Sequence, residues 1–372
     1  MTNTCSSNLI FLLILFASFL SSCSSYPTIR IEDSELESRK IESNFNVIRA
    51  VDFSSDGNLM VITGEAEGTQ DSNLGKVEIW DTNDWELIQT LETEKAYNLN
   101  AYFVSEDNEE VVVVNTSGEV SIWNTTTGAR DKVLVEGAEG ENIAMPVDFL
   151  QSQKLLSLIS SLGALISFDI DAEEGYEVFS LDNNDYRSQS IAFSEEGTYL
   201  AFLVSPQYVA EGDNDDALPS IIYVFDTETW EQISSTEIES YTVIDMSFID
   251  DRYFVLSGID GFLEIRNAET GEIAQNLSKE TPLDYTSLDS VRIVSKPDNN
   301  FFAVGSAEAV GVHSVVGAVT LWNSDSPEPL CSTGRMSATT ALNAAVAISP
   351  NGKHLAAAER SDVIVWDIKP CF

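Results

Sequence analysis

Two histidines and four cysteines are the scarcest reactive residues of this sequence, and their positions limit the chemistry that it can carry. His354 follows an Asn-Gly turn, and His313 lies in a long insertion with no other His or Cys nearby. A zinc site needs three or four ligands, mostly nitrogen and sulfur atoms. The sequence has no Gly-rich phosphate loop, nucleophile elbow or His-Glu-x-x-His pattern. These residues predict a protein without a cofactor and without catalytic activity.

The acidic run Glu211–Asp216 could offer oxygen ligands to calcium, which takes six to eight of them. Its spacing is not that of a known calcium loop, and a chain with 61 Asp and Glu residues forms such runs by chance. A solvated loop is therefore the first interpretation and a calcium site the alternative. The same reasoning applies to Asp182–Asp185.

The charge balance excludes one class of partner. The 61 acidic residues face 19 Lys and Arg residues, which gives a net charge of -42. Such a surface repels phosphate backbones and anionic lipids, so we expect no nucleic-acid binding. Solubility is the first explanation of the acidity, and an electrostatic role in the choice of partner is the alternative.

Residues 1–22 carry no charged side chain, and Leu9–Leu20 is an apolar run. A membrane-spanning helix needs about 20 apolar residues, so this shorter run fits a signal peptide better. Leu20-Ser21-Ser22-Cys23 resembles a bacterial lipobox. The resemblance implies a signal peptide over residues 1–22, a lipid on Cys23, an acidic tether over 23–35, and export to the periplasmic or outer side of a bacterial membrane. An ordinary signal peptide cut nearby, or an uncleaved anchor, is the alternative.

Internal repeats indicate the architecture. Seven strands recur every 41 to 57 residues, and each ends in an aromatic residue or Arg followed by Asp or Asn. They are Lys76–Asp81, Glu119–Asn124, Leu165–Asp169, Ile222–Asp226, Phe262–Asn267, Val319–Asn323 and Asp362–Asp367. An earlier strand in each repeat ends in a large apolar residue, namely Phe53, Phe103, Phe149, Phe193, Phe248, Ile293 or Ile348. A further strand lies between these two, and another follows.

This pattern of four strands in each of seven repeats, with Trp-Asp ends at Trp80-Asp81 and Trp366-Asp367, resembles the WD-repeat β-propeller family. The resemblance implies an all-β fold: a single seven-bladed β-propeller of four-stranded blades over residues 36–372. The Gly-His pair that family members often carry before the first strand is absent. We therefore expect apolar packing to hold the blades together.

The last repeat lacks residues for its fourth strand, since only five follow Asp367. Leu36–Ile41 precedes the first repeat at the distance at which other repeats place an outer strand. We expect it to pair with Val363–Asp367 and close the ring, which removes an open sheet edge. Cys331 and Cys371 follow the third strands of the sixth and seventh repeats, so adjacent blades could bring them into a disulfide; two free thiols are the alternative.

Five repeats place an aromatic residue at the entrance to the inner strand: Phe45, Tyr97, Tyr186, Tyr241 and Tyr285. The insertions Gly64–Leu74, Ser205–Ser220 and Gly305–Gly317 connect second and third strands and emerge on the same face. Aromatic anchors surrounded by polar loops are typical of protein-binding surfaces. Packing of these rings between the blades is the alternative.

Together these features predict a monomeric, membrane-anchored platform that binds a protein or peptide on its insertion-bearing face. A carbohydrate- or calcium-binding module is one alternative. A propeller enzyme is the other, and it is disfavoured because the sequence is poor in convergent acids, bases and metal ligands.

Overall fold

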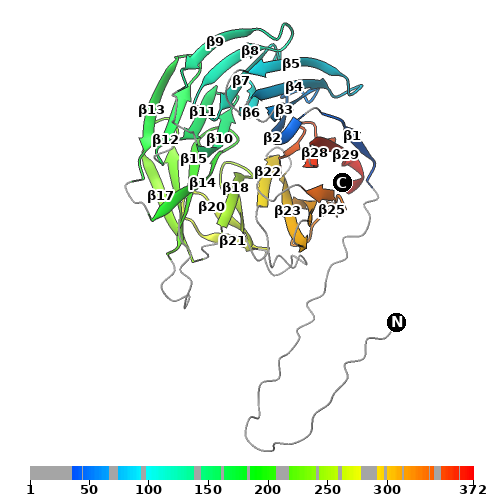
Figure 1. Ribbon diagram of the computed structural model, residues 1–372. Coiled ribbons are helices and arrows are strands. Elements are labelled where there is room, and N and C mark those ends of the chain that lie inside the picture. The colour runs from blue at the N-terminus through cyan, green and yellow to red at the C-terminus, as the bar shows by residue number, and fades with distance from the viewer. Residues whose placement is uncertain are drawn as a thin grey trace, which may run out of the picture.

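The fold is an all-β, seven-bladed β-propeller, as the repeats predicted (Figure 1). The computed structural model describes residues 36–43, 45–66, 74–93, 98–137, 144–160, 163–181, 185–206, 218–239, 243–258, 262–277, 291–296, 300–311, 314–334, 336–338, 345–359 and 361–372. Within these residues, seven antiparallel sheets follow one another around a ring, each built mainly from four strands consecutive in the chain.

Each blade runs from an inner strand at the channel to an outer strand at the periphery. Blades 1 to 3 are β2 (Phe45–Phe53), β3 (Leu59–Ala66), β4 (Gly75–Asp81) and β5 (Leu87–Thr93); β6 (Asn98–Phe103), β7 (Glu110–Asn115), β8 (Val120–Asn124) and β9 (Arg130–Val135); and β10 (Ala144–Leu150), β11 (Leu155–Ile159), β12 (Leu165–Asp169) and β13 (Glu174–Phe179). Blades 4 and 5 are β14 (Tyr186–Phe193), β15 (Tyr199–Pro206), β16 (Ser220–Asp226) and β17 (Gln232–Ile238); and β18 (Val243–Phe248), β19 (Tyr253–Gly258), β20 (Leu263–Asn267) and β21 (Ile273–Asn276).

The last two blades depart from this pattern. Blade 6 has five strands: β22 (Val291–Lys296), β23 (Phe301–Gly311), β24 (Ser314–Asn323), β25 (Cys331–Ser332) and β26 (Met336–Ala338), which pairs with β24. Blade 7 combines β27 (Val346–Ile348), β28 (His354–Glu359) and β29 (Asp362–Asp367) with β1 (Ser38–Ile41) from the other end of the chain.

The second strand of each blade is mostly apolar because neighbouring blades cover both of its faces. In β7, for example, Val111–Val114 are almost completely buried. The core accordingly lies between blades; one cluster joins Val61 and Val77 of blade 1 to Phe103 and Val113 of blade 2. Outer strands are more exposed, and in β17 only Ile238 is buried.

A repeated hydrogen bond explains the residue before the terminal Asp or Asn of the third strand. In β4, β8 and β24 the Trp indole N–H donates to a side chain two residues earlier, for instance Trp80 Nε1 to Glu78 Oε2 at 3.1 Å. Arg266 takes the Trp position in β20, and its guanidinium donates to Glu264 at 2.8 Å. Arg can replace Trp there because both present a planar N–H donor over an apolar body.

The N-terminal strand closes the ring, as predicted. In β1 and β29, Ser38 pairs with Trp366 and Ile41 with Val363. The Lys40 ammonium adds an ion pair of 2.6 Å with Asp362. Figure 1 shows the blue β1 beside the red β29. The two ends of the propeller therefore share one sheet, and that sheet has no gap where the ring begins.

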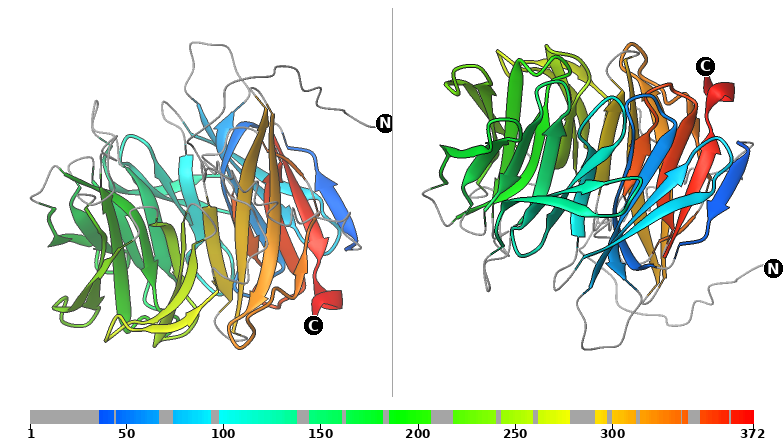
Figure 2. Two further views of the ribbon diagram at one scale, coloured as in Figure 1. Left: turned by 90° about the horizontal axis from the view of Figure 1, so that it is seen from below. Right: turned by 90° about the horizontal axis from the view of Figure 1, so that it is seen from above.

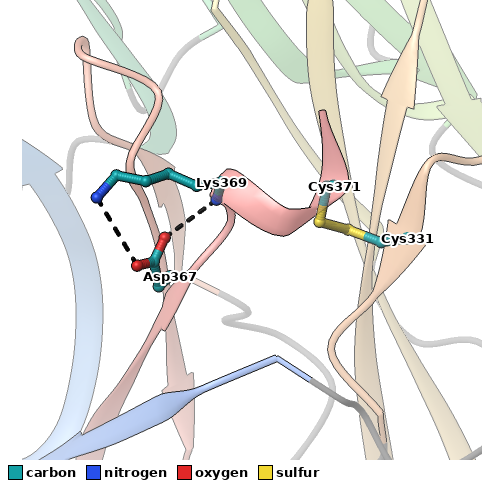
Figure 3. The surroundings of a disulfide bond; sticks show 4 residues. All are labelled: Cys331, Asp367, Lys369 and Cys371. Carbon is teal, nitrogen blue, oxygen red and sulfur yellow. Dashed lines mark hydrogen bonds and ion pairs between the residues drawn. A yellow bond between two sulfur atoms is a disulfide. The ribbon is translucent and has the colours of Figure 1, made fainter.

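A disulfide joins the last two blades (Figure 3). Cys331 in β25 and Cys371 in the short 3-10 helix η4 (Lys369–Cys371) have sulfur atoms 2.08 Å apart. The bridge spans a sequence separation of 40 residues. It therefore fixes the end of the chain to the outer part of blade 6.

Blade 6 also corrects two sequence interpretations. In β22, Ser295 lies opposite Phe302, the position that Phe149 has opposite Leu156 in blade 3. The inner-strand residue that corresponds to Phe149 is thus Ser295 and not Ile293. In addition, the insertion Gly305–Gly317 is not a plain loop, because β23 and β24 continue to pair through it as a long hairpin.

Within the described residues, no helix is long and apolar enough to span a bilayer.

Candidate functional site

Connections on the two faces of the propeller differ. The strands of each blade run between these faces (Figure 2). Because consecutive strands are antiparallel, the connections from second to third strands share one face with those that lead into the next blade. We call this the insertion face. It includes the long connections between β3 and β4 and between β15 and β16.

The rim predicted from the sequence is only partly described. The prediction that Phe45 belongs to the rim is wrong. Phe45 is 3% exposed and packs in the core between blades 7 and 1. The Lys76 ammonium lies 4.3 Å from the centre of its ring. The reason is the register, since Phe45 already belongs to β2 and pairs with Ala66. For this residue the packing alternative holds. Tyr97, Tyr241 and Tyr285 lie outside the described residues, as do Cys23, His313 and Glu211–Asp216.

Tyr186 lies on the insertion face in a group of partly exposed side chains between blades 3 and 4. Phe179, Leu181, Tyr186 and Tyr223 all pack on the same core cluster and keep part of their surface open. The rings of Phe179 and Tyr223 are 4.7 Å apart. Burial raises the pKa of the Tyr186 and Tyr223 hydroxyls. We call these four residues the aromatic junction.

The sequence identified Tyr186 but missed the other three members. Phe179 and Tyr223 stand inside strands, where an aromatic residue normally indicates core. Their partial exposure follows from the position of the outer strand β13 against the next blade, which a single strand pattern does not contain.

A second candidate site is the central channel, which holds a cavity of about 410 Å³. The first strands of all seven blades line it. Alternate residues of these strands face the channel, so two equivalent positions recur around the ring. One position holds Asp52, Tyr102, Asp148, Ala192, Ser247, Val294 and Ala347. The other holds Ala50, Asn100, Ser190, Asp245, Arg292 and Ala345 among the described residues.

Two channel aspartates join adjacent blades. The Phe193 backbone N–H of blade 4 donates to Asp148 Oδ2 at 2.8 Å, and the Ile293 N–H of blade 6 donates to Asp245 Oδ2 at 2.9 Å. The expected apolar packing between blades is present, and these carboxylates add hydrogen bonds to it. The reason is that a carboxylate at the channel can reach the unpaired inner edge of the next blade.

The Asp245 carboxylate has two further partners. The Ser190 hydroxyl donates to its Oδ1 at 2.6 Å, and the Arg292 guanidinium lies 3.7 Å from its Oδ2. Across the channel, the Tyr102 hydroxyl donates to the Val147 carbonyl at 2.8 Å and so ties blade 2 to blade 3.

Asp52 and Asp148 have unusual acidities. Burial raises the pKa of Asp52 to about 7, and the charge of Asp148 adds to the effect. Burial also raises the pKa of Asp148, to about 6, although its two backbone N–H donors oppose the shift. Both groups therefore titrate near neutral pH, unlike an ordinary carboxyl.

The described residues contain no cluster of possible metal ligands, and the histidine among them is not exposed. They contain no group of three or more His, Cys, Asp and Glu side chains that could hold a metal. His354 is half-buried, and its ring lies edge-on to Trp85 with centres 5.2 Å apart. Burial lowers the pKa of its imidazole, which is consistent with a packing role.

Comparison with known proteins identifies a similar fold and no relative by sequence. No protein-family model matches the chain, and a search of curated proteins gave no match. A chain of the solved structure "Crystal Structure of Mitotic Checkpoint Complex" matches over 97% of this chain and 98% of its own length. The TM-score is 0.60 and the sequence identity 15%. This likeness shows the fold, and the fold agrees with the resemblance to WD-repeat propellers.

Proposed function

We propose that this protein is an exported, membrane-anchored interaction platform that binds a protein or peptide on its insertion face, without catalysis. The observation that carries this proposal is the aromatic junction. A β-propeller commonly mediates protein interactions, and the structurally similar chain comes from the crystal structure of a mitotic checkpoint complex.

The aromatic junction has the chemistry of a protein-binding anchor. Tyr and Phe provide large contact areas at a small cost in side-chain entropy, and Tyr adds a hydroxyl that can hydrogen-bond to a partner. The rings of Phe179 and Tyr223 support each other at 4.7 Å, which holds them in place before a partner arrives. A preorganised surface loses less entropy on binding.

Exposed leucines support the same face. Leu218 is 44% exposed at the start of blade 4's third-strand region, and Leu74 is 41% exposed in the corresponding place in blade 1. Both follow a long connection on the insertion face. Apolar side chains within a polar surround are what a partner can desolvate.

A capture experiment tests the face. Full-length protein is used to capture partners from detergent-solubilised native membranes, in wild-type form and as the double variant Tyr186→Ala/Leu218→Ala. We expect the variant to lose about tenfold or more of the captured partner, since anchor residues each contribute roughly 1–2 kcal/mol or more. Tyr199→Ala is the matched control, because Tyr199 begins β15 on the opposite face.

Equal capture by wild type, double variant and control would exclude the aromatic junction as the binding surface. The pair Tyr97→Ala/Tyr241→Ala, suggested by the repeat spacing, then tests the rest of the insertion face. Circular dichroism of each variant verifies that the propeller has folded.

The anchor rests on the sequence of residues 1–35. The apolar run Leu9–Leu20 and the lipobox-like Leu20-Ser21-Ser22-Cys23 support a diacylated Cys23, and two acyl chains hold a protein stably at a membrane. We expect Cys23→Ser to abolish labelling with radioactive palmitate and to release the protein from the membrane fraction. Unchanged labelling of the variant would contradict a lipid on Cys23.

A further inference from the structure

The central cavity reaches a different part of the surface from the proposed partner site. Its lining extends to Ser194 and Glu195 in the turn between β14 and β15, on the face opposite the insertion face. Its volume of about 410 Å³ suits a small molecule or one long side chain. Ligand binding in the channel and partner binding on the insertion face can therefore be tested independently.

Most charged groups of the cavity already have partners. Arg292 pairs with Asp245 at 3.7 Å, and Arg49 pairs with Glu65. Asp148 accepts the backbone N–H groups of Phe149 at 2.9 Å and Phe193 at 2.8 Å. Each of these charges is thus compensated within the protein.

Asp52 differs from the other channel acids. Within the described residues, its carboxylate meets the N–H of Phe53 but no Lys or Arg side chain and no N–H of a neighbouring blade. Asp52 lines the cavity and is partly exposed. One carboxylate oxygen of Asp52 is therefore available to a group that enters the channel.

The electrostatics at Asp52 favour a positively charged ligand. Burial and the nearby charge of Asp148 together make ionisation of Asp52 costly, as its pKa of about 7 shows. A buried carboxyl group of this kind is stabilised either by binding a proton or by a cation beside its charged form. A cation that binds near pH 7 must then displace the proton.

The walls next to Asp52 leave room for that cation. Ala50 in the same strand, with Ala345 and Ala347 in the adjacent blade 7, contributes only methyl groups to the cavity. Tyr102 on the other side has a hydroxyl oxygen that can still accept a hydrogen bond while its proton binds Val147. A primary ammonium has three N–H donors, of which one can bind the Asp52 carboxylate and another the Tyr102 hydroxyl oxygen.

We propose that the central channel binds an organic ammonium group, with the Asp52 carboxylate as its ion-pair partner and Tyr102 as a neighbouring acceptor. The ammonium can belong to a free alkylamine or to a lysine side chain of a peptide; the chemistry is the same. A divalent metal is not the assigned ligand, since calcium asks for six to eight oxygen atoms and Asp52 offers one open carboxylate.

Isothermal titration calorimetry of the full-length protein tests the proposal. The probes are n-butylammonium chloride, Nα-acetyl-lysine amide, neutral n-butanol and calcium chloride, each at pH 8 and pH 6. Asp52→Asn removes the charge with little change of shape. Asp325→Asn, an exposed aspartate outside the cavity, is the matched control.

We expect butylammonium to bind the wild type and the Asp325→Asn control alike, and Asp52→Asn to lose roughly tenfold to a hundredfold in affinity. Affinity should be lower at pH 6 than at pH 8, with up to one proton released per ligand, because Asp52 must ionise. Tighter binding of the lysine derivative assigns a peptide side chain as the source, and tighter binding of butylammonium assigns a free amine.

Equal binding of n-butanol, an unchanged affinity in Asp52→Asn, or binding of calcium alone would overturn the proposal. The pH dependence of the wild type needs no variant, so it decides the matter even if Asp52→Asn folds poorly. A flat pH profile without proton release contradicts the role of Asp52.

Discussion

Blades 1 and 3 carry the same inner-strand triplet with different results. Val51-Asp52-Phe53 and Val147-Asp148-Phe149 occupy equivalent positions. Asp148 accepts an N–H from blade 4 and joins two blades, whereas Asp52 makes no such bond within the described residues. The channel neighbour differs too: blade 4 presents Ala192, and blade 2 presents Tyr102. A local triplet therefore places a carboxylate at the channel, but the next blade decides what the carboxylate does.

The largest effect should separate these two aspartates directly. Asp148→Ala leaves the N–H groups of Phe149 and Phe193 without their acceptor, and we expect a loss of stability on the order of 4 kcal/mol. Asp52→Ala removes a buried, poorly compensated charge and should cost little. Urea unfolding followed by circular dichroism measures both. Similar losses for the two variants would show that the triplet acts alike in both blades.

The junction between blades 6 and 7 provides a covalent contrast. The double variant Cys331→Ser/Cys371→Ser reopens a loop with a sequence separation of 40 residues, and we expect it to cost about 3 kcal/mol. Thermal unfolding under non-reducing conditions measures the loss. If the midpoint does not move, the strand pairing of β1 with β29 alone closes the ring.

The raised pKa of Asp52 predicts a pH-dependent difference in the free energy of unfolding. Its pKa is about 7 in the folded protein and near 3.8 when unfolded, so the folded state binds the extra proton between these values. Stability from this group is therefore present below pH 4 and lost as pH rises to 7. Asn cannot titrate, so the stability of Asp52→Asn relative to wild type should rise by about 4 kcal/mol between pH 4 and pH 8, since each of the roughly three pKa units corresponds to about 1.4 kcal/mol.

Unfolding curves of both proteins at pH 4, 6 and 8 isolate the contribution of Asp52 from the rest of the acidic chain. A constant difference across this range would show that Asp52 does not titrate near neutral pH. Asp148 remains in both proteins and keeps a slope of the same sign, because its pKa of about 6 is also raised.

The smallest effect concerns the residue that blade 2 places between the two aspartates. Tyr102→Phe removes the hydrogen bond to Val147, and we expect a cost of about 1 kcal/mol. A double-mutant cycle with Asp52→Asn measures whether Tyr102 and Asp52 interact. Strict additivity would indicate that the hydroxyl acts on blade 3 alone.

The sequence by itself determined the number of blades, their strand order and the closing strand. These follow from short-range signals: alternating apolar residues, turn residues, and an aromatic residue or Arg before Asp or Asn at a regular interval. The predicted pairing of Leu36–Ile41 with Val363–Asp367 is present as β1 and β29. It could be predicted because the last repeat has too few residues for its fourth strand.

Only the tertiary structure decided what lies between blades. Phe45 is buried, and Phe179 and Tyr223 meet in the aromatic junction. Asp148 and Asp245 accept hydrogen bonds from the next blade, whereas Asp52 lies open to the cavity. Each of these outcomes depends on which residue the neighbouring blade presents at a given height. That relation spans about 45 residues of sequence, as in Asp148 and Phe193, and no local pattern contains it.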